Sequence, residues 1–144
     1  TGAGSGFGLE CARIGARLDL FSTGSGITLL AFQQPERLGE TLGQWGVADA
    51  SVRLEAIAPQ MREARAQGFR AGPSGQLVGV TDISAPVYGH AGEAIAALTC
   101  AYIEHPGDSG SEARGQTLAR LRQVTEDLSF SRAGESLSRM LRPG

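Results

Sequence analysis

The sequence contains no lysine, so all 13 of its basic residues are arginine. This absence excludes enzymes that act through a lysine Schiff base and proteins with a Walker-type phosphate lysine. The arginines are not gathered into a basic run, and the formal net charge is -2. Because neutralising a phosphate backbone requires clustered basic residues, we do not expect this segment to contact DNA itself.

The sequence also has no apolar run of the roughly 18 residues that a membrane-spanning helix needs. Thr1 to Leu9 has neither the charged n-region nor the apolar h-region of a signal peptide. We therefore expect a cytoplasmic protein without membrane contact. The glycine-dense start lacks a hydrophobic period, which predicts a flexible lead-in over residues 1–12. The remaining residues, 13–144, are sufficient for one domain with one packed core.

Residues that could carry catalysis or bind a metal are sparse. Cys11 and Cys100 lack C-x-x-C spacing, and a disulfide is not expected in the cytoplasm. Cys100 alternates out of phase with Thr99 and is predicted to be a small core residue. His90 and His105 have no local ligand pattern, which is typical of solvated loops. We predict no catalytic residue, no metal site and no cofactor.

The most informative pattern is a pair of β-patterned segments, Gln76 to Tyr88 and Glu93 to Glu104. Both carry β-branched and small apolar residues, and the turn between them begins at Gly89 and ends at Gly92. Glycines at both ends of a short turn favour a β-hairpin. Pro86 belongs at an edge or a bulge, because proline lacks the N–H that a central ladder needs.

Helical spacing precedes and follows this hairpin. Ile57, Met61 and Ala64 predict a helix that Gly68 ends, and Pro59 fits its first turn. The other predicted elements are a short strand over Leu18–Phe21, helices over Ile27–Phe32, Glu36–Gln44 and Ile57–Gln67, a loop over His105–Gly110, a long helix carrying Leu118, Leu121, Val124 and Leu128, and a tail helix over Ser136–Leu141.

Several of these segments, in their order and spacing, resemble the effector-binding domain of IclR-family bacterial transcriptional regulators. The matching segments are Arg13-x-Gly15-x-Arg17-Leu18, Ser22-Thr23-Gly24-Ser25-Gly26, Ile57-x-x-x-Met61-x-x-x-Arg65-x-x-Gly68-Phe69, Gly79-Val80-Thr81-Asp82-Ile83-Ser84-Ala85-Pro86-Val87-Tyr88, Ala96-Ala97-Leu98-Thr99 and Ala119-Arg120-Leu121-x-x-Val124.

The resemblance covers roughly Arg13 to Arg132 and implies an α/β fold in which helices pack on a GAF-like antiparallel sheet. It also implies a small-molecule effector and assembly into a homodimer or tetramer. DNA would be contacted only through a winged helix-turn-helix domain, which has no counterpart before Gly8. We therefore expect an effector-binding domain that is incomplete and lacks its DNA-binding domain.

The first candidate site lies at Ser22 to Gly26, ahead of an apolar helical segment. Unpaired backbone N–H groups and the positive end of a helix dipole would meet a ligand there. The alternative is an ordinary capped helix start, with Ser22, Thr23 or Ser25 as the cap. The resemblance favours a pocket wall, because it implies effector contacts at Gly24 and Ser25. We include Gly26 in this candidate site.

The second candidate site lies on the hairpin, where Asp82 and Ser84 share one strand face, and Thr99 and Ala101 share a face of the other strand. A carboxylate among apolar residues is costly to bury unless it is paired, and Arg70 or another arginine would be its partner in a structural role. The resemblance instead implies effector contacts at Asp82, Thr99, Ala101 and Gly72. The last two lack the polar side chain often found there. A carboxylate at Asp82 would also repel an anionic effector, so the usual small organic acid is not expected.

The resemblance therefore predicts ligand sensing that alters DNA binding by a linked domain. Two alternatives remain open from the sequence. One is a small enzyme of similar topology, with Asp82 or Cys100 acting on a bound metabolite. The other is an oligomerisation module with a filled pocket. Trp45, next to Gly46, would cover a pocket or close a helix pair.

Overall fold

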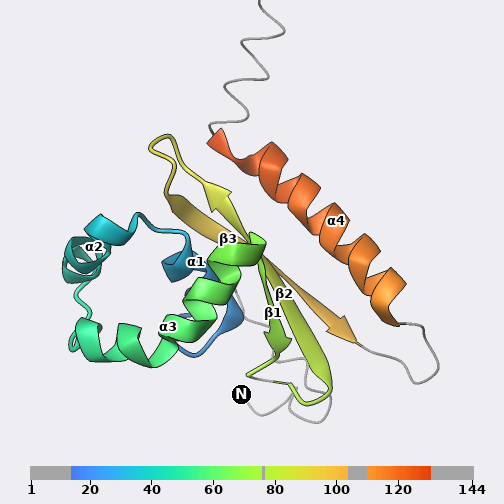
Figure 1. The fold of residues 1–144 in the computed structure, drawn as a ribbon, viewed down its shortest axis with the longest axis horizontal. Helices are drawn as coiled ribbons and strands as arrows, with labels where there is room; N and C mark the ends of the chain where they lie inside the picture. The colour runs from blue at the N-terminus through green and yellow to red at the C-terminus, as the bar shows by residue number, and fades with distance from the viewer. Residues whose placement is uncertain (1–13, 76, 104–109, 131–144) are drawn as a thin grey trace, which may run out of the picture.

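A computed structural model describes residues 14–75, 77–103 and 110–130. Three helices precede a three-stranded sheet, and a long helix follows it (Figure 1). This order confirms the predicted α/β fold. The elements are α1 (Gly24–Ala31), the 3-10 turn η2 (Pro35–Arg37), α2 (Leu38–Gln44), α3 (Ala50–Gln67), β1 (Arg70–Pro73), β2 (Val80–Tyr88), β3 (Ala94–Ile103) and α4 (Gly110–Leu128).

The sheet is antiparallel, with strand order β1-β2-β3. The pairing of β2 with β3 confirms the predicted hairpin, although β2 begins only at Val80, because Gly79 has a positive φ in the turn before it. Pro86 lies beyond Ser84, the last residue of β2 that pairs with β1. Among the described residues, β2 has a strand on one side only in this stretch, so the missing N–H of proline interrupts no second ladder there.

Different elements cover the two sheet faces. Helix α4 lies along one face, and α1 lies against the other with α3 and α2 beyond it (Figure 1). The α4 face is apolar, with Ile83, Ala85 and Leu121 buried and Cys100 packed against them, as predicted for this cysteine. The helices α1 to α3 have an apolar cluster of their own, formed by Ile27, Leu30, Ala31, Leu38, Leu42, Ile57, Met61 and Ala64.

The strand predicted over Leu18–Phe21 is wrong, because this segment forms an irregular turn leading into α1. The Phe21 N–H donates to the Asp19 carboxylate at 2.7 Å, and the Thr23 hydroxyl donates to the Asp19 carbonyl at 2.6 Å. Such local side-chain bonds compete with a strand ladder for the backbone. The bond from Phe21 is also the main reason that the pKa of Asp19 lies below its ordinary value.

Helix α3 begins at Ala50 rather than Ile57, so Pro59 lies inside the helix and not in its first turn. Asp49 precedes the helix with φ 54°, and although aspartate is a common cap residue, its side chain forms no capping hydrogen bond here. The end of the helix was predicted correctly. Gly68 has φ 85° and donates its N–H to the Ala64 carbonyl, as a left-handed C-terminal glycine does.

Strand β1 was not predicted, because four residues that include Gly72 and Pro73 carry little strand signal. The predicted lead-in, the tail helix Ser136–Leu141, His105 and Cys11 lie outside the described residues. Of the helices in the described ranges, none is long and apolar enough to cross a membrane.

Candidate functional site

The start of α1 is capped by Thr23, whose hydroxyl oxygen accepts the Gly26 N–H at 3.0 Å. The capped helix start is therefore present, with Thr23 as the cap. Ser25 is left to face the sheet instead. Its hydroxyl lies 2.6 Å from the Thr99 hydroxyl on β3. The cap and the candidate site thus use different residues of one short segment.

Three hydroxyl groups form a chain between α1 and the sheet. The Thr99 hydroxyl contacts Ser25 on one side and, at 2.8 Å, the Ser84 hydroxyl on the other. Ser84 has no exposed surface. Each hydroxyl donates one hydrogen bond and can accept two. The three hydroxyls together therefore retain acceptor capacity for a further group.

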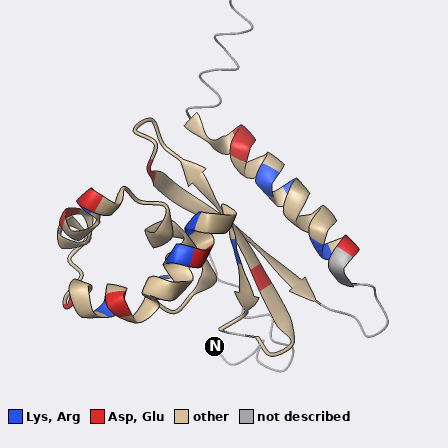
Figure 2. Ribbon diagram, viewed as in Figure 1, with Lys and Arg blue, Asp and Glu red and all other residues tan. Residues whose placement is uncertain are grey.

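The strand register extends this polar layer across the whole sheet. Arg70 pairs with Ser84, which pairs with Thr99. One row along, Gly72 pairs with Asp82, which pairs with Ala101. Since alternate residues of a strand share a face, these two rows lie on the same side. Figure 2 shows the basic segment of β1 beside the acidic segment of β2.

Gly24 is the point at which these groups converge. A Cβ at Gly24 would lie 3.0 Å from Arg70 Nη1, 3.3 Å from Ser84 Oγ and 3.5 Å from Asp82 Cβ. The glycine therefore allows the arginine and the sheet to approach the helix backbone closely. Of the predicted site residues, the structure brings together Gly24, Ser25, Asp82, Ser84 and Thr99.

Gly26 and Ala101 have other surroundings. Gly26 is buried against the backbone of Leu20, and Ala101 is exposed at the end of the Asp82 row. Ser25 and Gly26 also line a cavity of about 190 Å³, together with Leu18, Asp19, Leu20, Thr23, Leu29 and Ala97. Contact of any of these residues with an effector stays a prediction.

Arg70 has a partly satisfied guanidinium. Its Nη2 donates to Gln60 Oε1 at 3.2 Å, whereas its Nη1 is buried without a hydrogen-bond partner. Within the part of the chain that the structure describes, Asp82 forms no ion pair with it. The sequence-based alternative, in which Asp82 serves as the structural partner of Arg70, is therefore not realised.

The sequence patterns did not identify Thr28 as a candidate site residue. It is fully buried in α1, and its hydroxyl has no hydrogen-bond partner among the described residues. It follows Ser25 by three residues and Gly24 by four, so all three share one side of the helix. A polar residue at this spacing after the Gly-Ser pair was the available signal.

We expect Thr99→Val to destabilise the domain. The change keeps the shape of the side chain but removes the middle hydroxyl of the chain, leaving the buried Ser84 hydroxyl without its partner. The cost should be about 1 to 3 kcal/mol of unfolding free energy, measured by chemical denaturation. Thr117→Val on α4 is the matched control, because its hydroxyl bond is exposed. Equal effects of the two changes would contradict the account.

The comparison with protein families is unambiguous. A family model described as the bacterial transcriptional regulator IclR C-terminal region matches residues 9–130. No curated protein sequence matches the chain significantly. The matched family is one of transcriptional regulators and not of enzymes.

Solved structures agree with this match. The C-terminal domain of the E. coli transcriptional regulator KdgR is 25% identical, with a TM-score of 0.60 over 81% of this chain and 72% of that chain. The Agobacterium tumefaciens repressor BlcR is 25% identical, with a TM-score of 0.60 over 83% of this chain and 50% of that chain.

An IclR homolog from Microbacterium hydrocarbonoxydans, solved with 4-hydroxybenzoate, shares the fold at 24% identity and a TM-score of 0.60, over 87% of this chain and 50% of that chain. The chain thus spans about half the length of the BlcR and Microbacterium chains. On the family match over residues 9–130, the chain belongs to the IclR family of bacterial transcriptional regulators and corresponds to their C-terminal domain.

Proposed function

We propose that this domain senses a small polar effector, which binds between α1 and the sheet at Gly24, Ser25, Asp82, Ser84 and Thr99. The observation that carries the proposal is a polar layer between two apolar clusters. Arg70 Nη1, which lies close to Gly24, and Thr28 Oγ1, one helical turn after Gly24, are buried and have no partner in the described residues. Unpaired buried polar atoms are costly, and a bound ligand can satisfy them.

The charges suggest what the effector carries. Asp82 offers an acceptor for a ligand hydroxyl or amine, and Arg70 offers a donor for a ligand oxygen. An effector with both a donor group and an acceptor group would therefore fit better than a simple anion. Two relatives were solved with ligands that combine a hydroxyl group and an acceptor group, the Microbacterium homolog with 4-hydroxybenzoate and a double mutant of the Acinetobacter PobR inducer-binding domain with 3-hydroxybenzoic acid. Both ligands are organic acids, whose carboxylate Asp82 would repel in this chain.

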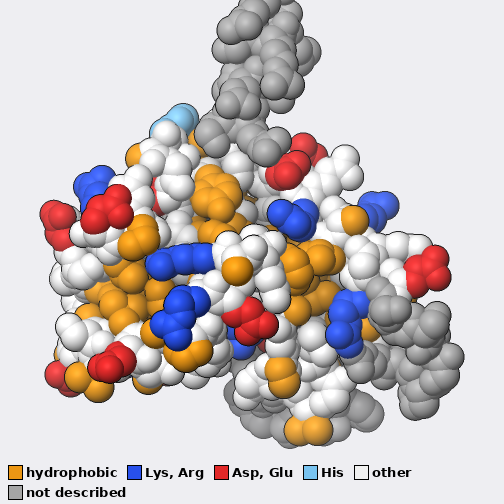
Figure 3. Space-filling view, in the orientation of Figure 1, with side chains coloured by type: hydrophobic (Ala, Val, Ile, Leu, Met, Phe, Trp, Pro, Cys, Tyr) orange, Lys and Arg blue, Asp and Glu red, His pale blue; other side chains and the backbone are white. Residues whose placement is uncertain are grey.

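The proposed mechanism is a shift between two arrangements of the domain. An effector that binds one arrangement more tightly favours it, and a linked winged helix-turn-helix domain then sits differently on its operator. DNA contact belongs to that linked domain. Figure 3 supports this assignment of DNA contact to another domain. Basic and acidic side chains are interspersed on the visible face, which offers no basic patch for a phosphate backbone. We further propose a cytoplasmic location and binding without turnover.

Calorimetric titration with hydroxybenzoates, and with amino alcohols and hydroxy acids of similar size, tests the proposal. Sensing predicts saturable binding and an unchanged ligand after incubation. Chemical conversion of the ligand would select the enzyme alternative, with Asp82 or Cys100 as the acting residue. Absence of binding across the set, with a dimer nonetheless formed, would select the oligomerisation module.

Self-association is a separate prediction. Val124 and Leu128 of α4, and Phe130 just beyond the helix, are between 44% and 55% exposed, which favours a contact with another copy. We expect a dimer at micromolar concentration, with a tetramer as the higher assembly. Light scattering that shows only monomer at high micromolar concentration would contradict this expectation for the chain as given.

A further inference from the structure

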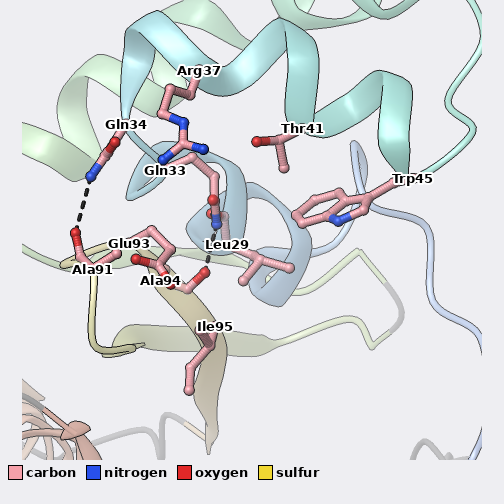
Figure 4. A pocket seen from close by; sticks show the side chains of 10 residues that line it. All are labelled: Leu29, Gln33, Gln34, Arg37, Thr41, Trp45, Ala91, Glu93, Ala94 and Ile95. Carbon is pink, nitrogen blue, oxygen red and sulfur yellow. Dashed lines mark hydrogen bonds between the residues drawn. The ribbon is translucent and has the colours of Figure 1, made fainter.

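A further cavity lies away from the polar layer, at the other end of α1. Its volume is about 390 Å³, within the range of small-molecule pockets. Figure 4 shows that it lies between α1, the η2–α2 segment and the start of β3. Its lining residues are Leu29, Gln33, Gln34, Arg37, Thr41, Trp45, Ala91, Glu93, Ala94 and Ile95.

One wall of this cavity is apolar and aromatic. Trp45 is the only tryptophan of the chain and is 46% exposed, and its ring lies beside Leu29 (Figure 4). Ile95 is 48% exposed on the opposite wall. Val87 pairs with Ala96 and Tyr88 with Ala94, so Ile95 is the extra residue of a bulge. A bulge re-aims a side chain, and here Ile95 lines the cavity.

Two glutamines fix the helix against the hairpin at this place. Gln33 Nε2 donates to the Ala94 carbonyl at 2.6 Å and to the Leu29 carbonyl at 3.0 Å. Gln34 Nε2 donates to the Ala91 carbonyl at 3.0 Å (Figure 4). The bonds to Ala94 and Ala91 join residues 61 and 57 positions apart, so they tie the segment after α1 to the hairpin at the edge of the cavity.

The cavity also has two opposite charges that do not neutralise each other. Arg37 reaches in from η2, and Glu93 lines the side that the hairpin forms (Figure 4). In the described ranges they form no ion pair, and Glu93 Oε2 is buried without a hydrogen-bond partner. Gly89 has no side chain and so leaves room for the other oxygen, since a Cβ there would lie 2.8 Å from Glu93 Oε1. The carboxylate thus lies close to the turn, with one oxygen unsatisfied.

We propose that this cavity is a second ligand site, separate from the polar layer, and that it takes a free α-amino acid with an apolar side chain. The ammonium group meets the Glu93 carboxylate, and the ligand carboxylate meets the Arg37 guanidinium, which binds carboxylates through paired donors. The side chain packs against Trp45, Leu29 and Ile95. A zwitterion matches both charges at once, whereas a simple acid or amine leaves one of them unpaired.

Trp45 provides the measurement, because it is the only tryptophan of the chain and it lines this cavity. Titration of the chain with L-leucine should give a saturable change in Trp45 emission. Isocaproate lacks the amine of leucine and isoamylamine lacks the carboxylate, so each should bind at least about tenfold more weakly. Equal binding of all three compounds, or no saturable response to L-leucine or L-phenylalanine, would overturn the proposal.

Two variants that each remove one charge from the cavity locate the response. Arg37→Gln and Glu93→Gln should each weaken L-leucine binding by about tenfold to a hundredfold. The matched controls Arg62→Gln and Glu55→Gln remove exposed charges from α3 and should leave it unchanged. Circular dichroism verifies that each variant is folded. A response that survives in both cavity variants but is lost in Ser84→Ala would assign the amino acid to the polar layer and overturn the second site.

Discussion

Replacing Gly26 by alanine is expected to lower the free energy of unfolding by about 3 kcal/mol, at the upper end of the usual cost of overpacking. A Cβ at this position would lie 2.3 Å from the Leu20 carbonyl oxygen and 2.6 Å from the Leu20 Cα. The obstacle is backbone, which cannot turn aside as a side chain can. The turn leading into α1 would have to move, and with it the Thr23 cap.

Chemical denaturation followed by circular dichroism measures this effect. Gly115→Ala is the matched control, because Gly115 lies in the interior of α4 and a Cβ there meets nothing within 4 Å. Since alanine is the better helix former, the control should gain about 0.5 to 1 kcal/mol. A Gly26→Ala variant as stable as the parent chain would show that Leu20 does not lie where the structure places it.

Asp82→Ala is expected to weaken effector binding by about 1.5 to 3 kcal/mol, roughly tenfold to a hundredfold in Kd. Asp82 is half-buried, and among the described residues it has no ion pair whose loss would destabilise the fold. Its carboxylate is therefore available to a ligand hydroxyl or amine. If it instead neutralised a buried arginine, the same change would cost about 3 to 5 kcal/mol of folding stability.

Ligand affinity and thermal unfolding, measured on the same variant, separate the two roles. Asp82→Asn is the matched companion, because it keeps the size of the side chain and an acceptor oxygen but removes the charge. We expect it to bind the effector with intermediate affinity. Unchanged affinity in Asp82→Ala, together with a large drop in melting temperature, would assign Asp82 to structure and remove it from the site.

The hairpin could be predicted from the sequence because its signals are local. Alternating β-branched residues and the glycines at the ends of the turn need no distant partner to be interpreted. Strand β1 could not be predicted in this way. Gly72 and Pro73 disfavour a strand, and the segment is a strand because it pairs with β2. The start of α3 was missed for a related reason. Asp49 adopts a left-handed conformation there, which no local pattern announces.

The candidate site was recovered in part. Ser25, Ser84 and Thr99 were predicted, and the structure joins their hydroxyls. Arg70 was considered only as a structural partner of Asp82, because its position relative to Gly24 depends on strand register and not on spacing in the sequence. Thr28 was missed although its helical spacing was visible. Contacts between residues far apart in sequence are set by packing, which a single sequence does not contain.

The central claim is that the effector binds between α1 and the sheet, and amide chemical shifts test it most directly. A compound from the titration set that binds saturably should be added to isotope-labelled protein. The account predicts that the largest shifts fall on Gly24, Ser25, Asp82, Ser84 and Thr99 and saturate with the calorimetric Kd. The account is contradicted if the compound binds equally tightly while these five amides stay unmoved.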